Sequence, residues 1–375
     1  MLQPSEIREQ CAALLQGSVS RASRSSAFIG LDGFVDQIIR VVDQRQDAEH
    51  YQAMTQISDL GRRISSASGK STNIELVVER TKIGGNGPIM ANALAQLGIK
   101  VTYLGALGYP NLNPVFNEFA HRAEVYSIAE PGHSDALEFH DGKVILGKLD
   151  QLKEINWTNL QLRFGRDRFI QRFSSCDLVG LVNWTMIPYM SDVWCSLLDE
   201  VCSQLAPPRR KIFFDLADPQ KRTPEDIQRA LELIGRFERY FEVILGLNEK
   251  EAYEIGEVLG LAPAHESRDA LCSMACEIQK RLNIGTLVVH PVTYAVAVSQ
   301  GVLSTAEGPF IPQPKITTGA GDHFNAGFCL GKLLGLENTY CLLAGVSTSG
   351  FYVKEARSPA IDDLVSLLRY WPETK

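Results

Sequence analysis

The sequence predicts an α/β fold, a three-layer α/β/α sandwich with a mostly parallel central sheet. Four short segments, DLVGLV, KIFFDL, FEVILGL and TLVVH, are almost entirely apolar, as expected of strands that helices cover on both faces. Between them lie longer stretches with apolar residues at helical spacing. Strands that alternate with helices in this way are typical of a parallel sheet.

The first half of the chain is expected to begin with an amphipathic helix in MLQPSEIREQCAALLQG. Further on, Gly84 and Gly85 open a helix that Gly98 closes, because glycine tolerates the left-handed backbone of a C-cap. The other elements predicted for this half are the strand Ala27–Leu31, a loop in GLDGFVDQI, the helix Ala48–Arg63, and the strands Ile74–Val78 and Val101–Leu104.

The second half begins with a predicted β-hairpin, because Asp141-Gly142 is a strong turn signal between two β-like segments. The predicted strands are Ala136–Phe139, Lys143–Leu149, Leu178–Asn183, Lys211–Leu216, Glu242–Leu247, Thr286–His290, Tyr294–Ser299 and Val302–Thr305. The predicted helices are Leu160–Phe173, Ser191–Leu205, Pro224–Phe237, one starting at Asn248, Ser267–Leu282, Tyr340–Phe351 and Ile361–Trp371.

We expect residues 1–375 to form a single domain, since no internal repeat and no proline- or glycine-rich linker divides the chain. Two segments, residues about 37–82 and about 132–150, interrupt the alternation of strands and helices. They are therefore expected to leave the main sheet.

Composition excludes several classes of protein. A formal charge of −7 provides no general basic surface for nucleic acid, and no apolar run approaches the length of a membrane span. The N-terminus lacks the pattern of a signal peptide. The eight cysteines mostly lie in apolar patterns and lack the spacing of a zinc site, which favours buried free thiols and a reducing compartment. We therefore expect a cytoplasmic protein.

The segment Thr317–Phe328, TTGAGDHFNAGF, is the strongest candidate for a functional site. It is a glycine turn that leads into a helix, where free backbone N–H groups and the helix dipole favour an anion. Asp322 would repel such an anion, but it could act as a base while the amides of Gly319, Ala320 and Gly321 hold developing charge. The alternative is a turn whose aspartate only caps the helix.

Further polar clusters follow predicted strands, as ligand-binding residues do in open parallel sheets. They are Asp32 with Asp36, Asp215 with Asp218, and Asn248 with Glu251, while Gly84–Gly87 opens a helix. Each has a structural alternative. Asn248 and Glu251 fit a capping box, the aspartates before Pro219 fit a turn, and the glycines fit a tight turn. These alternatives do not explain the order of all the clusters together.

That order resembles the ribokinase-like (PfkB-type) carbohydrate kinases from about Phe28 to Trp371. TTGAGDHFNAGF is similar to the family's C-terminal signature, and GGNGPIMANALAQLG has the spacing of its N-terminal sugar-binding signature. NEKE, with Asn248 and Glu251, fits its N-x-x-E element. The resemblance implies an ATP-dependent kinase that phosphorylates a primary hydroxyl of a sugar, polyol or nucleoside. Asp322 would be its base, and Gly319, Ala320 and Gly321 its anion hole.

The resemblance also implies how the remaining residues act. The excursions would form a small β lid, through which a homodimer could form. Adenine would lie between the loop after His290 and the helix Tyr340–Phe351. His323 is expected to face solvent or the nucleotide. The implied substrate residues are Asp36, Asp32, Gly84, Gly85 and Asn86; the implied nucleotide residues are Asn248, Thr318, His290 and Asn325; and Mg²⁺ would be held through water by Asn248 and Glu251.

The chain departs from the family pattern at several places, and two of them are single residues. Ile316 stands where the family usually has an aspartate, and Ile89 where it commonly has an asparagine. These departures keep open an alternative, a non-catalytic sensor of sugars or nucleosides derived from a kinase. Asp322 favours the enzyme, because binding alone does not require a base beside an anion hole.

Overall fold

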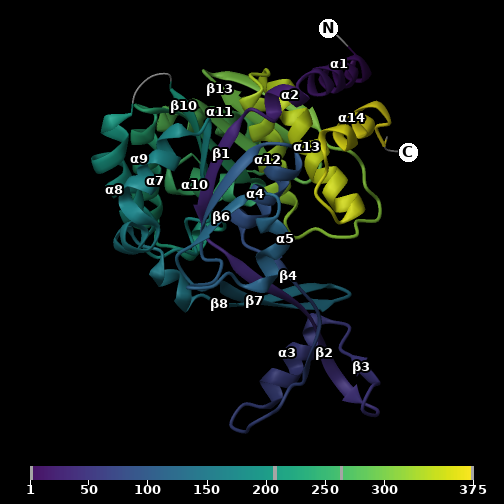
Figure 1. Ribbon diagram of the computed structural model, residues 1–375. Coiled ribbons are helices and arrows are strands. Elements are labelled where there is room, and N and C mark those ends of the chain that lie inside the picture. Colours follow the sequence, from purple (N-terminus) through teal and green to yellow (C-terminus); the bar gives the residue numbers. More distant parts are fainter. Residues whose placement is uncertain (1–2, 206–208, 262–264, 373–375) are drawn as a thin grey trace.

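A nine-stranded sheet forms the centre of the molecule in the computed structural model, which describes residues 3–205, 209–261 and 265–372 (Figure 1). The strand order is β14-β13-β12-β11-β10-β9-β1-β5-β6, and β6 to β12 are parallel along this order. Two antiparallel strands complete one edge. The strands are β1 (Ser26–Leu31), β5 (Lys100–Gly105), β6 (Glu124–Ser127), β9 (Leu178–Leu181), β10 (Arg210–Asp215), β11 (Phe241–Asn248), β12 (Thr286–His290), β13 (Tyr294–Ser299) and β14 (Val302–Glu307).

Helices cover both faces of this sheet, with a separate apolar core on each side. One layer contains α1 (Pro4–Gly17), α4 (Asn86–Gln96), α12 (Ala320–Leu333), α13 (Asn338–Glu355) and α14 (Ile361–Arg369), and the opposite layer contains α7 (Arg166–Ser175), α8 (Met190–Ser196), α9 (Pro224–Phe237), α10 (Glu249–Val258) and α11 (Arg268–Leu282). Short helices are α2 (Val19–Ala22), α5 (Asn117–Ala120) and α6 (Trp157–Asn159). The predicted three-layer α/β fold is thus confirmed.

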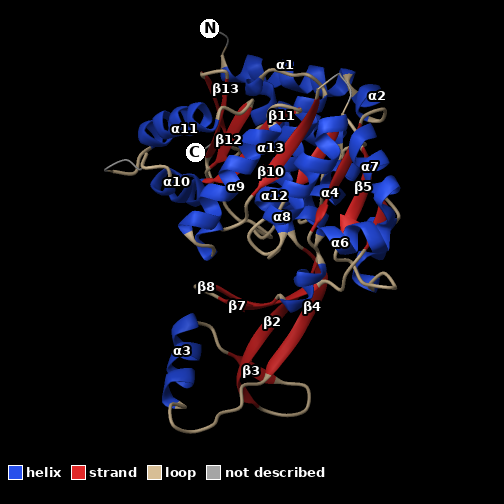
Figure 2. Cartoon of the chain, turned by 90° about the vertical axis from the view of Figure 1, so that its left-hand side faces the viewer, coloured by secondary structure: helices blue, strands red, loops and turns tan. Residues whose placement is uncertain are grey.

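A second sheet projects from the carboxyl edge of the first, and Figure 2 shows it below the main body. It consists of β2 (Phe34–Arg45), β3 (Tyr51–Ala53), β4 (Leu76–Gly84), β7 (Gly132–Phe139) and β8 (Gly142–Lys148), with helix α3 (Ile57–Ser66) packed on it. We call this unit the small sheet. It has its own apolar core, in which Val41, Met54 and Leu60 are buried. Both predicted excursions fall within it.

Three local predictions were wrong. The expected loop GLDGFVDQI enters the long strand β2, because β4 and β7 pair with it on both sides. The expected helix Ala48–Arg63 begins only at Ile57, since Tyr51 pairs with Arg45 as part of β3. The expected helix Leu160–Phe173 is interrupted at Gly165, where φ is 97°, and α7 starts after it.

Other expectations concern the cysteines and the membrane. All eight cysteines are free thiols, and Cys11, Cys176, Cys202, Cys329 and Cys341 are buried. Among the residues that the structure describes, no helix combines the length and the hydropathy that a membrane crossing requires.

Helix α12 packs unusually closely on α13. A Cβ on Gly327 would lie 2.3 Å from Thr348 Oγ1, and one on Gly345 would lie 2.8 Å from Phe324. Real side chains do not approach this closely, so the glycines allow the helices to touch along their backbones. This contact fixes the position of α12, the helix that begins at the glycine turn.

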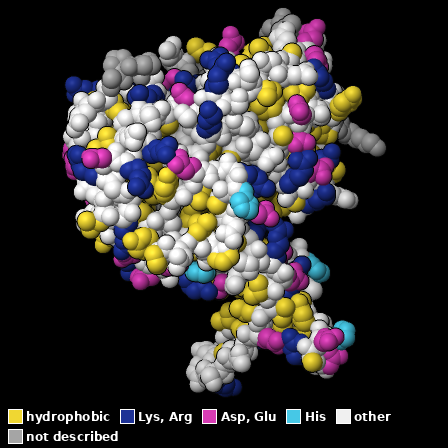
Figure 3. Space-filling model, in the orientation of Figure 1, with side chains coloured by type: hydrophobic (Ala, Val, Ile, Leu, Met, Phe, Trp, Pro, Cys, Tyr) yellow, Lys and Arg dark blue, Asp and Glu magenta, His cyan; other side chains and the backbone are white. Residues whose placement is uncertain are grey.

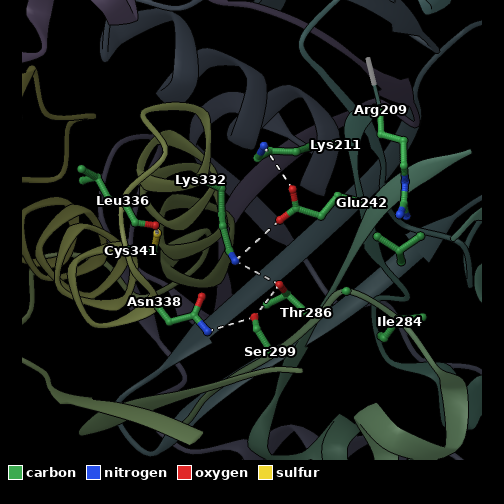
Figure 4. A network of polar contacts seen from close by, with 12 residues as sticks. Arg209, Lys211, Glu242, Ile284, Thr286, Ser299, Lys332, Leu336, Asn338 and Cys341 are labelled. Carbon is green, nitrogen blue, oxygen red and sulfur yellow. Dashed lines mark hydrogen bonds and ion pairs between the residues drawn. The ribbon is translucent and has the colours of Figure 1, made fainter. Parts of the chain in front are cut away.

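The far end of α12 is held by a polar network at the opposite edge of the sheet (Figure 4). The buried Lys332 donates to Thr286 Oγ1 at 3.0 Å and lies 3.9 Å from Glu242. Thr286 and Ser299 hydrogen-bond at 2.8 Å, and Asn338 donates to Ser299 at 2.9 Å. The network joins α12 and α13 to three strands, so both ends of α12 are fixed relative to the sheet.

We expect Gly327→Ala to destabilise the protein by about 1–3 kcal/mol, because the added methyl forces α12 away from α13. The free energy of unfolding in urea measures this. Gly61→Ala in helix α3 is the matched control, since its Cβ would meet nothing within 4 Å. That control should be neutral or stabilising by up to about 1 kcal/mol. Equal stability of the Gly327→Ala variant and the wild type would contradict the close packing.

Candidate active site

A cavity of about 250 Å³ lies where the small sheet meets the carboxyl edge of the main sheet. Residues from both sheets line it, and they are far apart in sequence. Its polar lining consists of Asp36, Lys82, Asn86, Ser134, Asn183 and Asp322. Asp36, Asn86 and Asp322 were predicted as site residues, and Gly85 and Thr318 also line this cavity.

Asp322 lies in the first turn of α12 and is only 7% exposed. Asn86 donates to its Oδ1 at 3.0 Å, and among the described residues this is its one hydrogen-bond partner. Burial, followed by the charge of Asp32, raises the pKa of Asp322 well above its ordinary value, while the Asn86 bond opposes the shift. A carboxylate with a raised pKa is a stronger base, and its second oxygen remains available in the cavity.

The turn before Asp322 has the geometry of an anion site. Gly319 is the N-cap of α12 with φ of 93°, a conformation that glycine adopts without strain. In the described chain, the amides of Gly319 and Gly321 have no hydrogen-bond acceptor. The predicted role of the Ala320 amide is wrong in this conformation, since it donates to the carbonyl of Thr317 at 3.1 Å to close the turn. Two of the three predicted amides are therefore open to an anion.

His323 and Tyr352 support this turn from behind. His323 is 2% exposed, so the expectation that it faces solvent or a nucleotide was wrong. Its Nδ1 contacts the carbonyl of Gly319 at 2.7 Å and must be the donor, because a carbonyl only accepts. The ring stacks on Tyr352, with centroids 3.6 Å apart, and the Tyr352 hydroxyl donates to the carbonyl of Thr318 at 2.9 Å. These bonds fix the peptide that carries the open Gly319 amide and the peptide that precedes the open Gly321 amide.

Asp36 faces the same cavity from strand β2 of the small sheet, which was predicted as a loop. A Cβ on Gly84 would lie 2.2 Å from Asp36 Oδ1, so only glycine lets the carboxylate lie against this backbone. Burial raises the pKa of Asp36, while the charge of Lys82 and a hydrogen bond from Ser134 oppose the shift. Asp36 is thus a buried carboxylate whose charge a neighbouring lysine balances.

Asp32 does not face the cavity. It is fully buried, and its carboxylate accepts hydrogen bonds from the Gly87 amide at 2.9 Å and from Asn183 Nδ2 at 2.7 Å. The predicted contact between Asp32 and a substrate stays a prediction. The carboxylate instead joins the end of β1 to the start of α4, and burial raises its pKa to about 6.

A second, larger cavity of about 650 Å³ opens beside the ends of β11 and β12. Two predicted nucleotide residues, Asn248 and His290, line it. Its walls also carry Glu249, Glu254, Glu257 and Glu266. These carboxylates suit hydroxyl groups, and Lys250 lies among them. The cavity lies along α10 rather than along the helix α13 that was expected to hold adenine.

Two other predicted residues form hydrogen bonds inside the protein. Asn325 is 1% exposed and donates to Asp215 at 2.9 Å, which contradicts a direct contact with a nucleotide. Glu251 is 5% exposed and accepts from the amides of Asn248 and Asp218, both at 2.8 Å. Glu251 thus forms a capping box with Asn248, the N-cap of α10, and its predicted hydrogen bond to metal-bound water stays a prediction.

Several lining residues were missed. Asn183 follows strand β9 and obeys the same strand-end rule that identified Asp215, so the sequence contained its signal. Lys82 and Ser134 lie within strands of the small sheet, where nothing in the sequence distinguishes them from solvent-facing residues. Tyr352 lies inside α13 and is brought to the turn only by helix packing.

Comparisons with known proteins give a consistent result. The family model described as prokaryotic ketohexokinase matches residues 8–371. The ketohexokinase of Haloferax volcanii is 26% identical over 346 residues, 92% of this chain and 91% of that protein. Arabidopsis thaliana ribokinase, solved with ribose and ATP, has a TM-score of 0.63 at 16% identity and covers 92% of this chain and 98% of its own. Adenosine kinase from Sinorhizobium meliloti has a TM-score of 0.62 at 17% identity, with the same coverage of 92% and 98%.

The buried His323 predicts a dependence of stability on pH. Burial lowers its pKa from 6.5 to about 4, so the unfolded chain binds a proton that the native state refuses. The contribution of His323 to stability is therefore lost as the pH falls below 6.5, and this contribution alone amounts to about 2 kcal/mol between pH 7 and pH 5. Chemical denaturation at both values measures it.

In His323→Asn this component should disappear, so the variant should lose about 2 kcal/mol less than the wild type between these pH values. The matched control is His121→Asn, which removes an exposed histidine. The control should retain the wild-type difference between the two pH values. An unchanged difference in His323→Asn would show that the ring does not resist protonation.

Proposed function

Because this chain belongs to the prokaryotic ketohexokinase family, within the ribokinase-like carbohydrate kinases, we propose that it transfers the γ-phosphoryl group of ATP to a primary hydroxyl of a sugar. Membership makes it a phosphotransferase with an alcohol group as acceptor. A ketohexose is the first substrate to test. The observation that carries the proposal is a buried carboxyl group, Asp322, beside the open amides of Gly319 and Gly321.

In the proposed mechanism Asp322 accepts the proton of the acceptor hydroxyl. The hydroxyl oxygen attacks the γ-phosphorus, and the bond from that phosphorus to the β-phosphate oxygen breaks. Gly319 and Gly321 donate to the oxygens of the group in transfer, whose negative charge the N-terminus of α12 favours. Positioning and charge stabilisation of this kind are the main contributions of a protein to phosphoryl transfer. Asn86 holds the base in place through its bond to Oδ1.

The remaining cavity residues suit an uncharged polyol. Asp36 and Asn183 offer acceptors and donors to neighbouring hydroxyls, while Lys82 balances the charge of Asp36. The opposite wall is apolar and includes Phe34, Ile145 and Met186. Such a wall matches the C–H face of a sugar. Of the predicted acceptor residues, we propose Asp36, Gly85 and Asn86 for direct contact, and Gly84 for allowing Asp36 its position.

We propose that ATP enters from the side of Asn248 and His290, with Thr318 near its terminal phosphate. Asn248 Oδ1 is occupied by the Glu251 amide at 2.9 Å, so its amide nitrogen is the group left for a phosphate oxygen. Among the described residues no cluster of three His, Cys, Asp or Glu could hold a metal ion. This supports Mg²⁺ held mainly by the phosphates and by water, as is usual for this ion.

One buried atom fits such a hydrated ion. Among the described residues Asp215 Oδ1 has no hydrogen-bond partner, although Asp215, the last residue of β10, is only 7% exposed. Burial and the neighbouring charges of Glu251 and Asp322 raise its pKa well above the ordinary value, so a cation nearby would relieve repulsion. We propose Asp215 as the acceptor for a metal-bound water. When bound, Mg²⁺ would neutralise charge on the phosphates.

We further propose that residues 1–375 act as one domain and that the small sheet is its lid. Closure over the cavity would exclude water from the transferred group. The small sheet also exposes apolar side chains: Leu76 and Val78 are 42% and 46% exposed, and Ile145 and Leu146 are 55% and 50% exposed. Figure 3 shows hydrophobic side chains gathered on this projecting unit. They suit a homodimer formed through the lid.

Asp322→Asn should lower kcat by roughly a hundredfold or more while the KM for the sugar stays nearly unchanged, because the base is lost and the shape is kept. An assay coupled to ADP release, with fructose first and then a panel of sugars and nucleosides, measures this. The control is Asp192→Asn, whose carboxylate is 60% exposed and pairs with Arg229. It should retain wild-type kinetics. No turnover of any acceptor by the wild type, together with no ATP binding, would overturn the kinase.

The wild type should also lose kcat as the pH falls, since the base acts only when it is ionised. The raised pKa of Asp322 places this loss above the pH at which an ordinary aspartate would protonate. Rates measured with both substrates saturating, over a range of pH, show this loss of kcat on the acid side. A profile that stays flat down to pH 4 would mean that Asp322 is not the base.

Asp36→Asn should raise the KM for the sugar at least about tenfold while the KM for ATP stays within about threefold, because a charged acceptor of hydroxyl protons is lost. The matched control is Asp43→Asn on the same strand. Its carboxylate pairs with Arg63 outside the cavity and is 44% exposed. A larger effect on the KM for ATP than on that for the sugar would exclude Asp36 from the acceptor site.

A further inference from the structure

The cavity of about 250 Å³, which we call the acceptor cavity, is bounded on the main-body side by a loop. Residues 182–189 connect β9 to α8 without helix or strand, and Asn183 and Met186 from this loop line the cavity. Asn183 has a φ of 60°, a left-handed backbone that a residue other than glycine keeps only where its surroundings hold it. Within the loop, the Ile187 amide reaches the Trp184 carbonyl only at 3.4 Å. The position of the loop therefore depends on contacts from outside it.

Arg222 provides such contacts. It lies between β10 and α9, and its side chain is 17% exposed. Its Nε donates to the carbonyl of Thr185 at 3.1 Å, and its Nη2 donates to the carbonyls of Trp184 at 3.2 Å and Ile187 at 2.7 Å. Its Nη1 donates to the carbonyl of Pro188 at 3.4 Å. One guanidinium group thus holds four carbonyls of a single loop.

The chemistry of arginine explains this set of contacts. A guanidinium group has five N–H donors in a rigid plane and no acceptor, so it can bind several carbonyls at once. The centre of the Arg222 guanidinium also lies 4.7 Å from the centroid of the Trp184 ring, within the range of a cation–π contact. The carboxylate of Asp226 is 3.9 Å from Nη1 and is 46% exposed, so this ion pair contributes little. The planar arrangement of the donors, more than the charge, therefore fixes the loop.

The segment that carries Arg222 is also joined to the loop by backbone bonds. It follows Asp215, whose carbonyl accepts from the Trp184 amide at 3.4 Å. The Thr185 amide donates to the carbonyl of Leu216 at 2.9 Å. The loops that follow β9 and β10 are thus connected at one end by these bonds and at the other end by Arg222. Together they form one unit that carries both a wall of the acceptor cavity and Asp215.

We propose that Arg222 is a positioning residue for the acceptor, which holds the loop 182–189 so that Asn183 and Met186 complete the acceptor cavity. This inference rests on the proposed kinase function and adds to it a residue that acts without touching the sugar. The lining of the cavity includes Asn183 and Met186 but not Arg222. Arg222 therefore acts from behind the loop.

The loss of this guanidinium group has a defined consequence. Four carbonyls lose a donor, and the loop relaxes toward other backbone conformations. The sugar then meets a displaced wall and binds more weakly. The cavity beside Asn248 and His290, from which ATP is proposed to enter, is lined by other segments and is affected less.

The test is Arg222→Lys, which keeps the charge but lacks the planar set of donors. The KM for the sugar should rise at least about tenfold, while kcat and the KM for ATP should each change less than about threefold, because only the acceptor side is displaced. The matched control is Arg229→Lys. Arg229 joins α9 to α8 through an ion pair with Asp192 at 2.8 Å and is 49% exposed. This control should keep the wild-type KM values.

Arg222→Ala gives a second readout that general destabilisation would not produce. Removal of the side chain leaves a space in which a free guanidinium ion can bind to the same carbonyls. Millimolar guanidinium chloride should therefore lower the KM for the sugar in this variant at least about fivefold, whereas sodium chloride at the same concentration should not. If the variant were only less stable, guanidinium chloride would weaken it further, because this salt favours the unfolded state.

An Arg222→Lys variant whose KM for the sugar stays within about threefold of an active wild type would overturn this inference alone. An equal rise in the KM values for sugar and ATP would also overturn it, because such a rise indicates a general loosening of the fold. The same holds if guanidinium chloride restores no more than sodium chloride does in Arg222→Ala. A wild type without kinase activity would overturn the proposed function and, with it, this inference.

Discussion

Four carboxyl groups buried at one edge of a single sheet constrain the rest of this structure. Asp32, Asp215, Glu251 and Asp322 are each less than 9% exposed, and like charges so close together repel one another. The fold supplies a donor for each: Asn183 for Asp32, Asn325 for Asp215, the Asn248 amide for Glu251 and Asn86 for Asp322. Repulsion among these carboxyl groups lowers the stability of the protein at this edge. The close packing of α12 on α13 and the polar network around Lys332 hold the edge together.

The architecture of the main body could be predicted because its signals are local. Apolar runs identified the buried strands, and capping residues located helix starts such as that of α10 at Asn248. The small sheet was harder to predict. Apolar and polar residues alternate only in part along strand β2. The strand forms because β4 and β7, distant in sequence, pair with it. Pairing partners of this kind cannot be identified from the residues of one strand.

The candidate site was predictable to the extent that its chemistry lies in strand ends and glycine turns. Asp322, Asp36 and Asn86 meet at one cavity as the patterns indicated. The strand-end rule also pointed to Asp32, whose side chain turns inward, because a strand-end position does not reveal which way a side chain faces. Lys82 carried no signal at all, since a lysine on a lone strand is usually solvent-facing. Its place in the cavity arises from the packing of one sheet against another.

The division of the site between two sheets has a thermodynamic consequence. Asp36 belongs to the small sheet and Asp322 to the main body, and short connections at Phe34 and Gly84 join the two units. If the small sheet closes as proposed, an acceptor that touches both carboxylates is held fully only by the closed form. Its apparent dissociation constant is then the intrinsic one divided by the closed fraction, so a form populated at about 1% weakens apparent affinity about a hundredfold. Met54 and Leu60 are buried in the core of the small sheet, outside the cavity. Residues of this kind then influence the affinity for the sugar, because they help to determine which fraction of the protein is in the closed form.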